Sequence, residues 1–215
     1  MTDLSQRTHA LKIAVFAAAI LLSYFFADVP LARLCEPFKY SRPHWLESFT
    51  QAAGQYGQAY VVIFTLAVIL ALEPKRRADA KRLLLAVALA AVTVHLVKMT
   101  AGRARPLEYF ESGRMWRIFE GWRDNNYTAF PSAHTIAAFA LTGALSAMYP
   151  RGRGVFLVAA GLCGLTRILT VQHYVSDVAV AAALGLWMGG GVYRWKWSVR
   201  LTGGESQRDS QLREP

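Results

Sequence analysis

The sequence predicts an all-α membrane protein: a bundle of six transmembrane helices with one short amphipathic helix in the membrane interface. Three observations predict this fold class. Hydrophobic residues make up 54% of the 215 residues, and charged residues only 18%. The mean hydropathy is +0.24, which is more apolar than a soluble domain of this length can hide from water. Six apolar stretches each come close to the ~17–25 residues that a helix needs to cross a bilayer.

The positive charge of the chain does not point to nucleic acid. Lys and Arg number 24 against 14 Asp and Glu, a formal charge of +10. A soluble nucleic-acid-binding protein carries its basic residues on an otherwise polar surface, and a disordered basic tail needs low hydrophobicity. The bilayer is therefore the expected partner, and nucleic acid is not. Cys35 and Cys163 form neither a disulfide framework nor a zinc pattern, so we expect two small buried apolar side chains.

The predicted spans follow one another along most of the chain. They cover residues 11–27, 56–72, 83–99, 132–149, 155–171 and 175–193. The first could instead be a secretory signal, because Arg7 and Lys12 precede it. Phe25-Phe26-Ala27 is a poor cleavage site, however, and the run is longer than a usual signal core, so we interpret it as a retained span. A soluble helical bundle is the other alternative, but these stretches have no polar face to present to water.

Basic residues gather on one side of the predicted membrane. With both termini on that side, it collects 14 of the 24 Lys and Arg residues, in the N-terminal segment, the loop 73–82, the turn near Pro150 and the tail. The positive-inside rule makes this side cytoplasmic. One transmembrane domain is expected over residues 1–199. The polar tail over 200–215 is expected to be a disordered cytoplasmic segment.

Two segments on the opposite side are expected to be ordered. Residues 43–53 place Trp45, Phe49 and two alanines at helical spacing, and the stretch is too short to span, so it predicts an amphipathic helix in the interface. The segment 100–131 is long for a loop and carries two tryptophans among Arg and Glu. Its aromatic residues favour an ordered lid at the level of the lipid headgroups.

Ionisable residues near the outer ends of the spans are the first candidates for function, because such residues are costly inside a membrane. Lys98 lies near the outer end of the third span, and Arg105 follows seven residues later. Seven residues are two helical turns, so both side chains are expected to face the same way before Pro106 breaks the helix. An interface position in which Lys98 reaches up to the headgroups is the alternative.

The start of the fourth span has the features of an anion site. Pro131 and Ser132 are both good opening residues for a helix, and Ala133 and His134 follow them. The first N–H groups of this helix have no partner within it, and the helix dipole is positive at that end. An anion placed there would be stabilised by both effects.

The fifth and sixth spans contribute a cation, a histidine and a carboxylate. Arg167 lies near the outer end of the fifth span, and His173 lies in the turn that follows. Asp177 comes four residues after His173, so the two are expected to share a helical face. A carboxylate beside a histidine fixes its tautomer and leaves the other nitrogen as a nucleophile. Together with a second histidine as general acid, these groups favour a site for a dianionic phosphate.

In these motifs the chain resembles the type 2 phosphatidic acid phosphatase (PAP2) superfamily of membrane lipid phosphatases. The signature of that family is Lys-x6-Arg-Pro, then Pro-Ser-x-His, then Ser-Arg-x5-His-x3-Asp. In this chain the three parts are Lys98 to Arg105-Pro106, Pro131-Ser132-Ala133-His134, and Thr166-Arg167 with His173 and Asp177. Thr166 replaces the more frequent Ser, and Ala133 the more frequent Gly. Neither position supplies a charge or a nucleophile, so neither weakens the resemblance much.

The resemblance implies a role for each matching residue. His173 would attack phosphorus and form a phosphohistidine, Asp177 would hold and polarise His173, and His134 would protonate the leaving oxygen and then activate water. The phosphoryl oxygens would be held by Lys98, Arg105, Ser132, Ala133 and Arg167. Family members need no metal or other cofactor, and the sequence shows no cluster of outer carboxylates that could hold Mg²⁺.

The resemblance therefore implies hydrolysis of a membrane lipid phosphate or diphosphate. The candidates are undecaprenyl diphosphate, phosphatidylglycerol phosphate, phosphatidic acid and a lipid A phosphate. The expected location is a bacterial inner membrane, with the active site facing the periplasm. Two alternatives stay open: a lipid phosphotransferase that uses the same intermediate, and a non-catalytic transporter or structural subunit. For Arg103, outside the motif, an interface anchor is the preferred interpretation, with a headgroup contact as the alternative.

Overall fold

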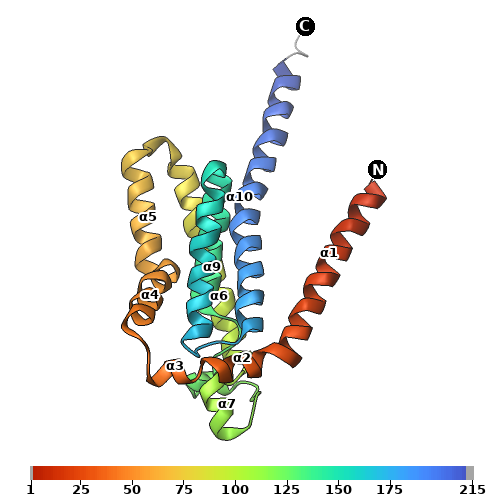
Figure 1. Ribbon diagram of the computed structural model, residues 1–215. Helices are drawn as coiled ribbons and strands as arrows, with labels where there is room; N and C mark the ends of the chain where they lie inside the picture. The colour runs from red at the N-terminus through yellow and green to blue at the C-terminus, as the bar shows by residue number, and fades with distance from the viewer. Residues whose placement is uncertain (1, 212–215) are drawn as a thin grey trace.

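Helix α8 (Ala133–Met148) is the central element of the computed structural model, which describes residues 2–211. It packs against α6 (Arg77–Ala101), α9 (Arg153–Leu169) and α10 (Val175–Gln211), and these four helices form the core of the bundle (Figure 1). Ten of the 16 residues of α8 are buried. Its sequence is almost free of charge and rich in Ala, Thr and Gly, which suits a helix that is covered on most sides.

Small residues set the distance between α8 and α10. Gly185 and Gly189 lie one turn apart on α10, and a Cβ atom at Gly189 would lie 2.2 Å from the carbonyl oxygen of Ala140. A Cβ atom at Gly185 would lie 2.6 Å from the carbonyl oxygen of Ile136. Two helices this close pack backbone against backbone, which is how helices associate inside a bilayer. The register of α10 on α8 therefore depends on these glycines.

The peripheral helices complete one side of the bundle. Helix α4 (His44–Gly54) packs on α9 and confirms the short amphipathic helix that the sequence predicts over 43–53. A 3₁₀ turn, η2 (Gln55–Gly57), leads from α4 into α5 (Ala59–Leu72), and the chain bends by 59° at this break. Helix α5 continues through a basic turn into α6.

The first helix lies apart from the rest. Helix α1 (Thr2–Leu22) diverges from the bundle (Figure 1), and none of the apolar window of its candidate span is buried. A single π turn, η1 (Ser23–Ala27), then leads into α2 (Asp28–Cys35), and both contact α10. A short helix, α3 (Pro37–Tyr40), follows. The N-terminal segment is thus fastened to the bundle at the far end of α1.

The helical membrane class that the sequence predicts is confirmed. Among the described residues, four helices are long and apolar enough to cross a membrane: Ala10–Tyr40, Pro74–Ala101, Pro150–Leu169 and Val175–Arg194. The bent pair formed by α4 and α5 would make a fifth, and α8 is apolar but shorter, at 16 residues. The protein is therefore an integral membrane protein, and the number of six spans stays a prediction.

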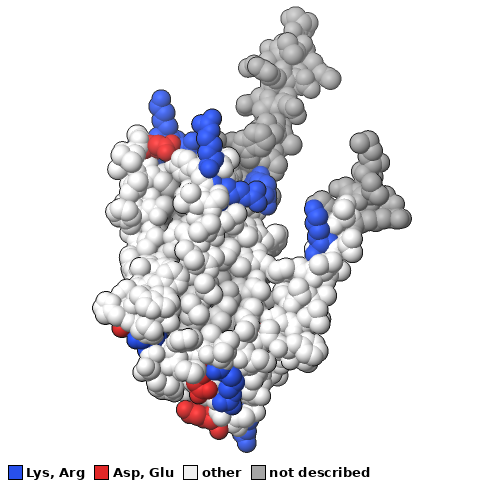
Figure 2. All heavy atoms as spheres, in the orientation of Figure 1, with Lys and Arg blue, Asp and Glu red and all other residues white. Residues whose placement is uncertain are grey.

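Charge is distributed as a membrane requires. In the view of Figure 2, Lys and Arg gather at the end where α5 meets α6, mixed charges lie around α4 and α7, and most of the surface between is uncharged. Helix α1 begins and α10 ends at the same end of the molecule (Figure 1). The disorder predicted for residues 200–215 stays a prediction: α10 extends to Gln211, and residues 212–215 lie outside the described part.

The segment 100–131 is ordered, and its first residues show where α6 ends. Helix α6 ends at Ala101 because Gly102 adopts a left-handed conformation with φ +62°, and a Cβ atom there would lie 1.6 Å from the carbonyl oxygen of Arg117. The expectation that Lys98 and Arg105 share one helix is therefore wrong. Arg105 instead precedes a separate short helix, α7 (Pro106–Ser112). Both cysteines are free and buried, as the sequence predicts.

The close approach of α8 and α10 yields a matched pair of variants. Gly189→Ala places a methyl group against the Ala140 carbonyl, and this overpacking should cost roughly 1–3 kcal/mol of unfolding free energy. Gly191→Ala, two residues along the same helix, meets no atom within 4 Å. Thermal unfolding in detergent, followed by circular dichroism, should show a lower midpoint only for Gly189→Ala. Equal midpoints would contradict the packing.

Candidate active site

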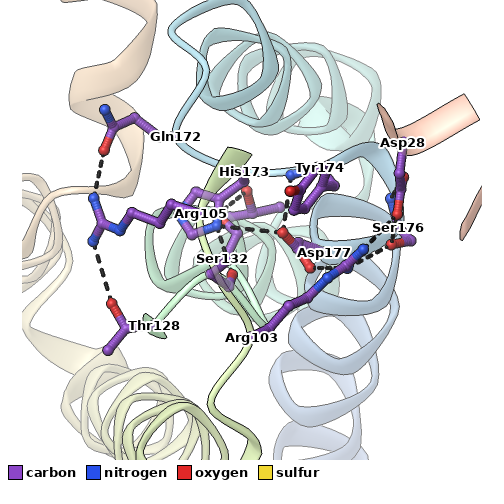
Figure 3. Close-up of polar contacts among 12 residues, drawn as sticks. Asp28, Arg103, Arg105, Thr128, Ser132, Gln172, His173, Tyr174, Ser176 and Asp177 are labelled. Carbon is purple, nitrogen blue, oxygen red and sulfur yellow. Dashed lines mark hydrogen bonds and ion pairs between the residues drawn. The ribbon is translucent and has the colours of Figure 1, made fainter. Parts of the chain in front are cut away.

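Lys98 and Arg105 meet at one backbone segment, although they lie on different elements. The buried ammonium group of Lys98 donates to the carbonyl oxygen of Thr128. The guanidinium group of Arg105 donates to Thr128 Oγ1 at 3.3 Å and to Gln172 Oε1 at 2.6 Å (Figure 3). Burial lowers the pKa of Arg105. Its buried Nε has no partner among the described residues, so this donor is left for a ligand.

The start of α8 presents unpaired backbone donors. Ser132 occupies the N-cap position and is fully buried, but its side chain makes no capping hydrogen bond. Its hydroxyl instead accepts from Thr135 Oγ1 at 2.9 Å, and its N–H donates to the carbonyl oxygen of Asp177 at 3.4 Å. The first N–H groups of the helix, which include those of Ala133 and His134, have no partner within α8. This geometry suits a bound anion.

His173 is positioned mainly by a backbone carbonyl. Its Nδ1 lies 2.6 Å from the carbonyl oxygen of Ala129 and 3.8 Å from Oδ2 of Asp177. Because a carbonyl can only accept, Nδ1 carries the proton and Nε2 keeps its lone pair. Burial is the main cause that lowers the pKa of His173, although the Asp177 carboxylate opposes it. The imidazole is therefore held neutral, as a nitrogen nucleophile requires.

The turn that carries His173 differs from the expected helix. Helix α10 begins at Val175, so His173 precedes it and only Asp177 lies in its first turn. The expectation that these two residues share a helical face is therefore wrong. The chain reverses at Val171, a buried β-branched residue with φ +57°. Such a conformation costs on the order of 1–3 kcal/mol and often occurs beside functional residues.

Arg103 is the residue that motif reasoning missed. It is only 1% exposed and forms ion pairs with Asp177 and with Asp28, the latter at 2.7 Å. Ser176 links the two sides, because its hydroxyl accepts from Arg103 at 2.8 Å and its N–H donates to Asp28 at 3.0 Å (Figure 3). Burial alone would lower the pKa of the guanidinium, but the two carboxylates raise it. The interpretation of Arg103 as an interface anchor is therefore wrong.

Three aromatic rings enclose the same guanidinium. Their centroids lie 4.4 Å from the Arg103 guanidinium carbon for Tyr174, 5.1 Å for Tyr24 and 5.2 Å for Trp116. The Trp116 indole N–H donates to the Tyr24 hydroxyl at 2.8 Å. Cation–π contacts of this kind stabilise a desolvated guanidinium. One signal in the sequence could have indicated this cluster: Asp28 is a carboxylate directly after a predicted span, where an ionisable residue needs a partner.

Arg167 and His134 form the other side of the site. A Cβ atom at Gly54 would lie 2.8 Å from Nη2 of Arg167, so the guanidinium fits there because residue 54 has no side chain. A Cβ atom at Gly57 would lie 2.4 Å from the His134 carbonyl oxygen, so the η2 turn lies directly on the start of α8. His134 is within electrostatic range of Arg167, His173, Lys98 and Arg105.

The structure thus brings all the predicted site residues together at one end of the bundle. These residues are Lys98, Arg105, Ser132, Ala133, His134, Arg167, His173 and Asp177. Among the described residues, no group of three or more His, Cys, Asp or Glu side chains could hold a metal ion. Within the site, the Asp177 and Asp28 carboxylates are both paired with Arg103. The positive charges of Lys98, Arg105 and Arg167 are left for a ligand.

Comparison with known proteins identifies the family of the chain. Residues 79–200, more than half of the chain, match the PAP2 superfamily. The chain therefore belongs to the PAP2 superfamily. It is 34% identical over 94 residues to the lipid A 1-phosphatases of Rhizobium johnstonii and Rhizobium etli. These matches cover 43% of this chain but only 38% and 40% of the relatives' own lengths.

Two crystal structures share the fold. LpxE from Aquifex aeolicus has a TM-score of 0.62 and 24% identity, and the match covers 78% of this chain and 94% of that one. A transmembrane PAP2-type phosphatidylglycerolphosphate phosphatase from Bacillus subtilis has a TM-score of 0.61 and 19% identity, covering 88% of this chain and 94% of that one. At these identities the likeness establishes the arrangement of the helices.

The contact between Gly54 and Arg167 provides a test of anion binding. In Gly54→Ala the new methyl group displaces the Arg167 guanidinium, whereas Gly161→Ala, on α9, meets no atom within 4 Å. A hydrogen bond to a charged group contributes about 1.5–3 kcal/mol, so its loss should weaken binding about tenfold or more. Calorimetric titration with orthovanadate should show this loss for Gly54→Ala and none for Gly161→Ala. Equal affinities would contradict the placement of Arg167.

The burial of His173 predicts how it titrates. Its pKa should lie below the ordinary 6.5, because the protonated form loses hydration in the site. Replacement of Asp177 by Asn should lower the pKa further, because the carboxylate opposes the shift. Nitrogen-15 NMR of histidine-labelled protein, with His173→Gln to assign the resonance, measures both values. A depressed pKa also means that this residue's contribution to stability is lost as the pH falls through it. A pKa above 6.5 would contradict the neutral nucleophile.

Proposed function

We propose that the protein is a membrane phosphatase that removes a phosphate from a lipid phosphate or diphosphate through a phosphohistidine. The observation that carries this proposal is the placement of His173, whose proton is held on Nδ1 by Ala129 next to Lys98 and Arg105. The names of the relatives and structural neighbours favour two of the candidate substrates, a lipid A phosphate and phosphatidylglycerol phosphate.

In the first half-reaction the phosphoryl group moves from the lipid to the enzyme. Nε2 of His173 attacks phosphorus, the bond from phosphorus to the leaving oxygen breaks, and His134 gives its proton to that oxygen. The Asp177 carboxylate, 3.8 Å from Nδ1, offsets the positive charge that develops on the imidazole. Negative charge on the phosphoryl oxygens is stabilised by Lys98, Arg105, Arg167, Ser132 and the N–H groups at Ala133.

In the second half-reaction the enzyme is restored. His134, now unprotonated, takes a proton from water as the water oxygen attacks phosphorus. The bond between phosphorus and Nε2 breaks, inorganic phosphate leaves, and His134 is again protonated. No metal is required, because protein cations surround the phosphate, so phosphate release should persist in excess EDTA. If the acceptor were a second lipid instead of water, radiolabelled phosphate would appear in that lipid and not as free phosphate.

Variants of the two histidines test the mechanism most directly. His173→Ala removes the nucleophile, so no phosphoenzyme should form from any substrate. His134→Ala keeps the nucleophile but loses the general acid, a contribution of about 10²–10⁴-fold. That contribution shrinks when the leaving group is already a weak base. His134→Ala should therefore form the phosphoenzyme from para-nitrophenyl phosphate far faster than from a lipid alkyl phosphate, as measured by rapid quench with ³²P-labelled substrate.

Acid lability identifies the trapped phosphate as a phosphohistidine, and peptide mapping identifies the residue that carries it. Phosphohistidine is labile in acid and stable in base, and peptide mapping should place it on His173 in the His134→Ala variant. It should also accumulate there, because the same variant lacks the group that activates water. Labelled phosphate on His134, or any phosphoenzyme in His173→Ala, would reverse the two roles. A wild-type protein that releases no phosphate from any lipid phosphate would favour a non-catalytic membrane protein.

We further propose that the site faces the periplasm of a bacterial inner membrane, with both termini in the cytoplasm. The excess of basic residues around the turn between α5 and α6 supports this orientation. Ser112→Cys, on α7, should react with an impermeant thiol reagent in intact cells, whereas Ala78→Cys should react only after the membrane is opened. Both positions are exposed, and both native cysteines are buried. The reverse pattern would place the site in the cytoplasm.

A further inference from the structure

A polar pocket adjoins the phosphate site and shares Arg167 with it. It has a volume of about 240 Å³ and lies between α4, the η2 turn and the end of α9. Two arginines, three glutamines and two threonines dominate its lining: Arg42, Arg167, Gln51, Gln55, Gln58, Thr50 and Thr170. None of the described residues that line it carries a carboxylate. A pocket lined by polar groups is suited to a polar ligand that can form hydrogen bonds with them.

The pocket adjoins the phosphate site through Arg167. Arg167 belongs to both, because Gly54 gives its guanidinium room. Gly57, which lies between the lining residues Gln55 and Gln58, is close to the His134 backbone at the start of α8. In the proposed mechanism His134 protonates the leaving oxygen. Because Arg167 lines both places, a leaving group attached to the bound phosphate would extend toward this pocket.

The free hydrogen-bonding groups of the pocket include both donors and acceptors. Arg42 uses Nε on the Phe38 carbonyl at 2.7 Å, which leaves its two terminal nitrogens. Gln51 uses one end of its amide on Glu47, and Gln55 uses one end of its amide on Tyr60. The other end of each amide, the oxygen of Gln51 and the nitrogen of Gln55, is free to bind a ligand. The Gln58 side chain has no hydrogen-bond partner among the described residues, so both of its ends are free.

This mixture selects among possible ligands. A phosphate is only an acceptor, so it would leave the amide oxygens unpaired. An apolar chain would leave every polar group unpaired, at a cost of about 1–3 kcal/mol for each buried one. A hydroxyl group both donates and accepts, and several hydroxyls on neighbouring carbons match a ring of amides and guanidinium groups. The lining thus fits a sugar or another polyol.

We propose that this pocket binds the hydroxyl-bearing headgroup of the leaving group, the polyol or sugar to which the scissile phosphate is attached. The inference rests on the proposed function and narrows its substrate class. Phosphatidylglycerol phosphate, whose glycerol carries a free hydroxyl, should be preferred over phosphatidic acid, whose leaving group carries none. The hydroxyls hold the leaving oxygen beside His134, so the preference appears in kcat/KM.

The test compares these two substrates in mixed micelles. In the double variant Gln55→Ala/Gln58→Ala, the ratio of kcat/KM for phosphatidylglycerol phosphate over phosphatidic acid should fall about tenfold, the equivalent of one or two neutral hydrogen bonds. Ser48→Ala, an exposed position on α4 outside the pocket lining, is the control and should keep the wild-type ratio. A ratio that is unchanged in the double variant overturns the proposal.

A binding measurement separates this inference from the proposed function. The affinity for phosphatidylglycerol in detergent micelles, followed by intrinsic tryptophan fluorescence, needs no turnover. It should be several-fold weaker in the double variant than in wild type or Ser48→Ala, and equal affinities would overturn the proposal. A wild-type protein that binds phosphatidylglycerol in this way but hydrolyses no lipid phosphate would refute the proposed function and leave the pocket assignment intact. Circular dichroism melting confirms that the double variant is folded.

Discussion

The buried guanidinium of Arg103 is the interaction on which the site depends. It forms ion pairs with Asp28, directly after the first helical segment, and with Asp177, in the first turn of α10. Removal of one partner from such a buried cluster typically costs about 3–5 kcal/mol, because a desolvated charge is left alone. The pairing also has an electrostatic consequence. Arg103 offsets half of the charge of the two carboxylates, and with Lys98, Arg105 and Arg167 the cations of the site outnumber its carboxylates, so the surroundings of a phosphate stay positive.

The backbone just before α8 does much of the positioning that side chains were expected to do. The carbonyl of Thr128 accepts from Lys98, and the next carbonyl, that of Ala129, holds Nδ1 of His173. Three residues later the N–H of Ser132 bonds to Asp177. One short segment therefore positions Lys98, His173 and the start of α8. Because α8 is the central helix and is buried on most sides, this segment is fixed by the core of the bundle.

Much of this could be predicted from the sequence, and the limits have physical reasons. The spans are readable because a bilayer demands length and apolarity, and the motif residues because they recur at fixed spacings. The pairing of Asp28 with Arg103, 75 residues apart, leaves no local pattern. The left-handed backbone of Gly102 ends α6 before Arg105. The seven-residue spacing between Lys98 and Arg105 does not show where the helix ends. The role of the Ala129 carbonyl is equally hidden, because every residue carries one.

The position of α1 follows from the same electrostatics. None of the apolar window of its candidate span is buried, so packing against the bundle does not hold it. The N-terminal segment contacts the bundle through the residues that follow α1. Asp28 pairs with Arg103, and the Tyr24 ring lies over the same guanidinium together with Trp116. Docking of this segment and completion of the charge cluster are therefore one event. Displacement of the segment would leave Arg103 with one carboxylate and expose the cluster to water, where the ion pairs weaken. The first helix is thereby coupled to the order of Asp177, and through it to the surroundings of His173.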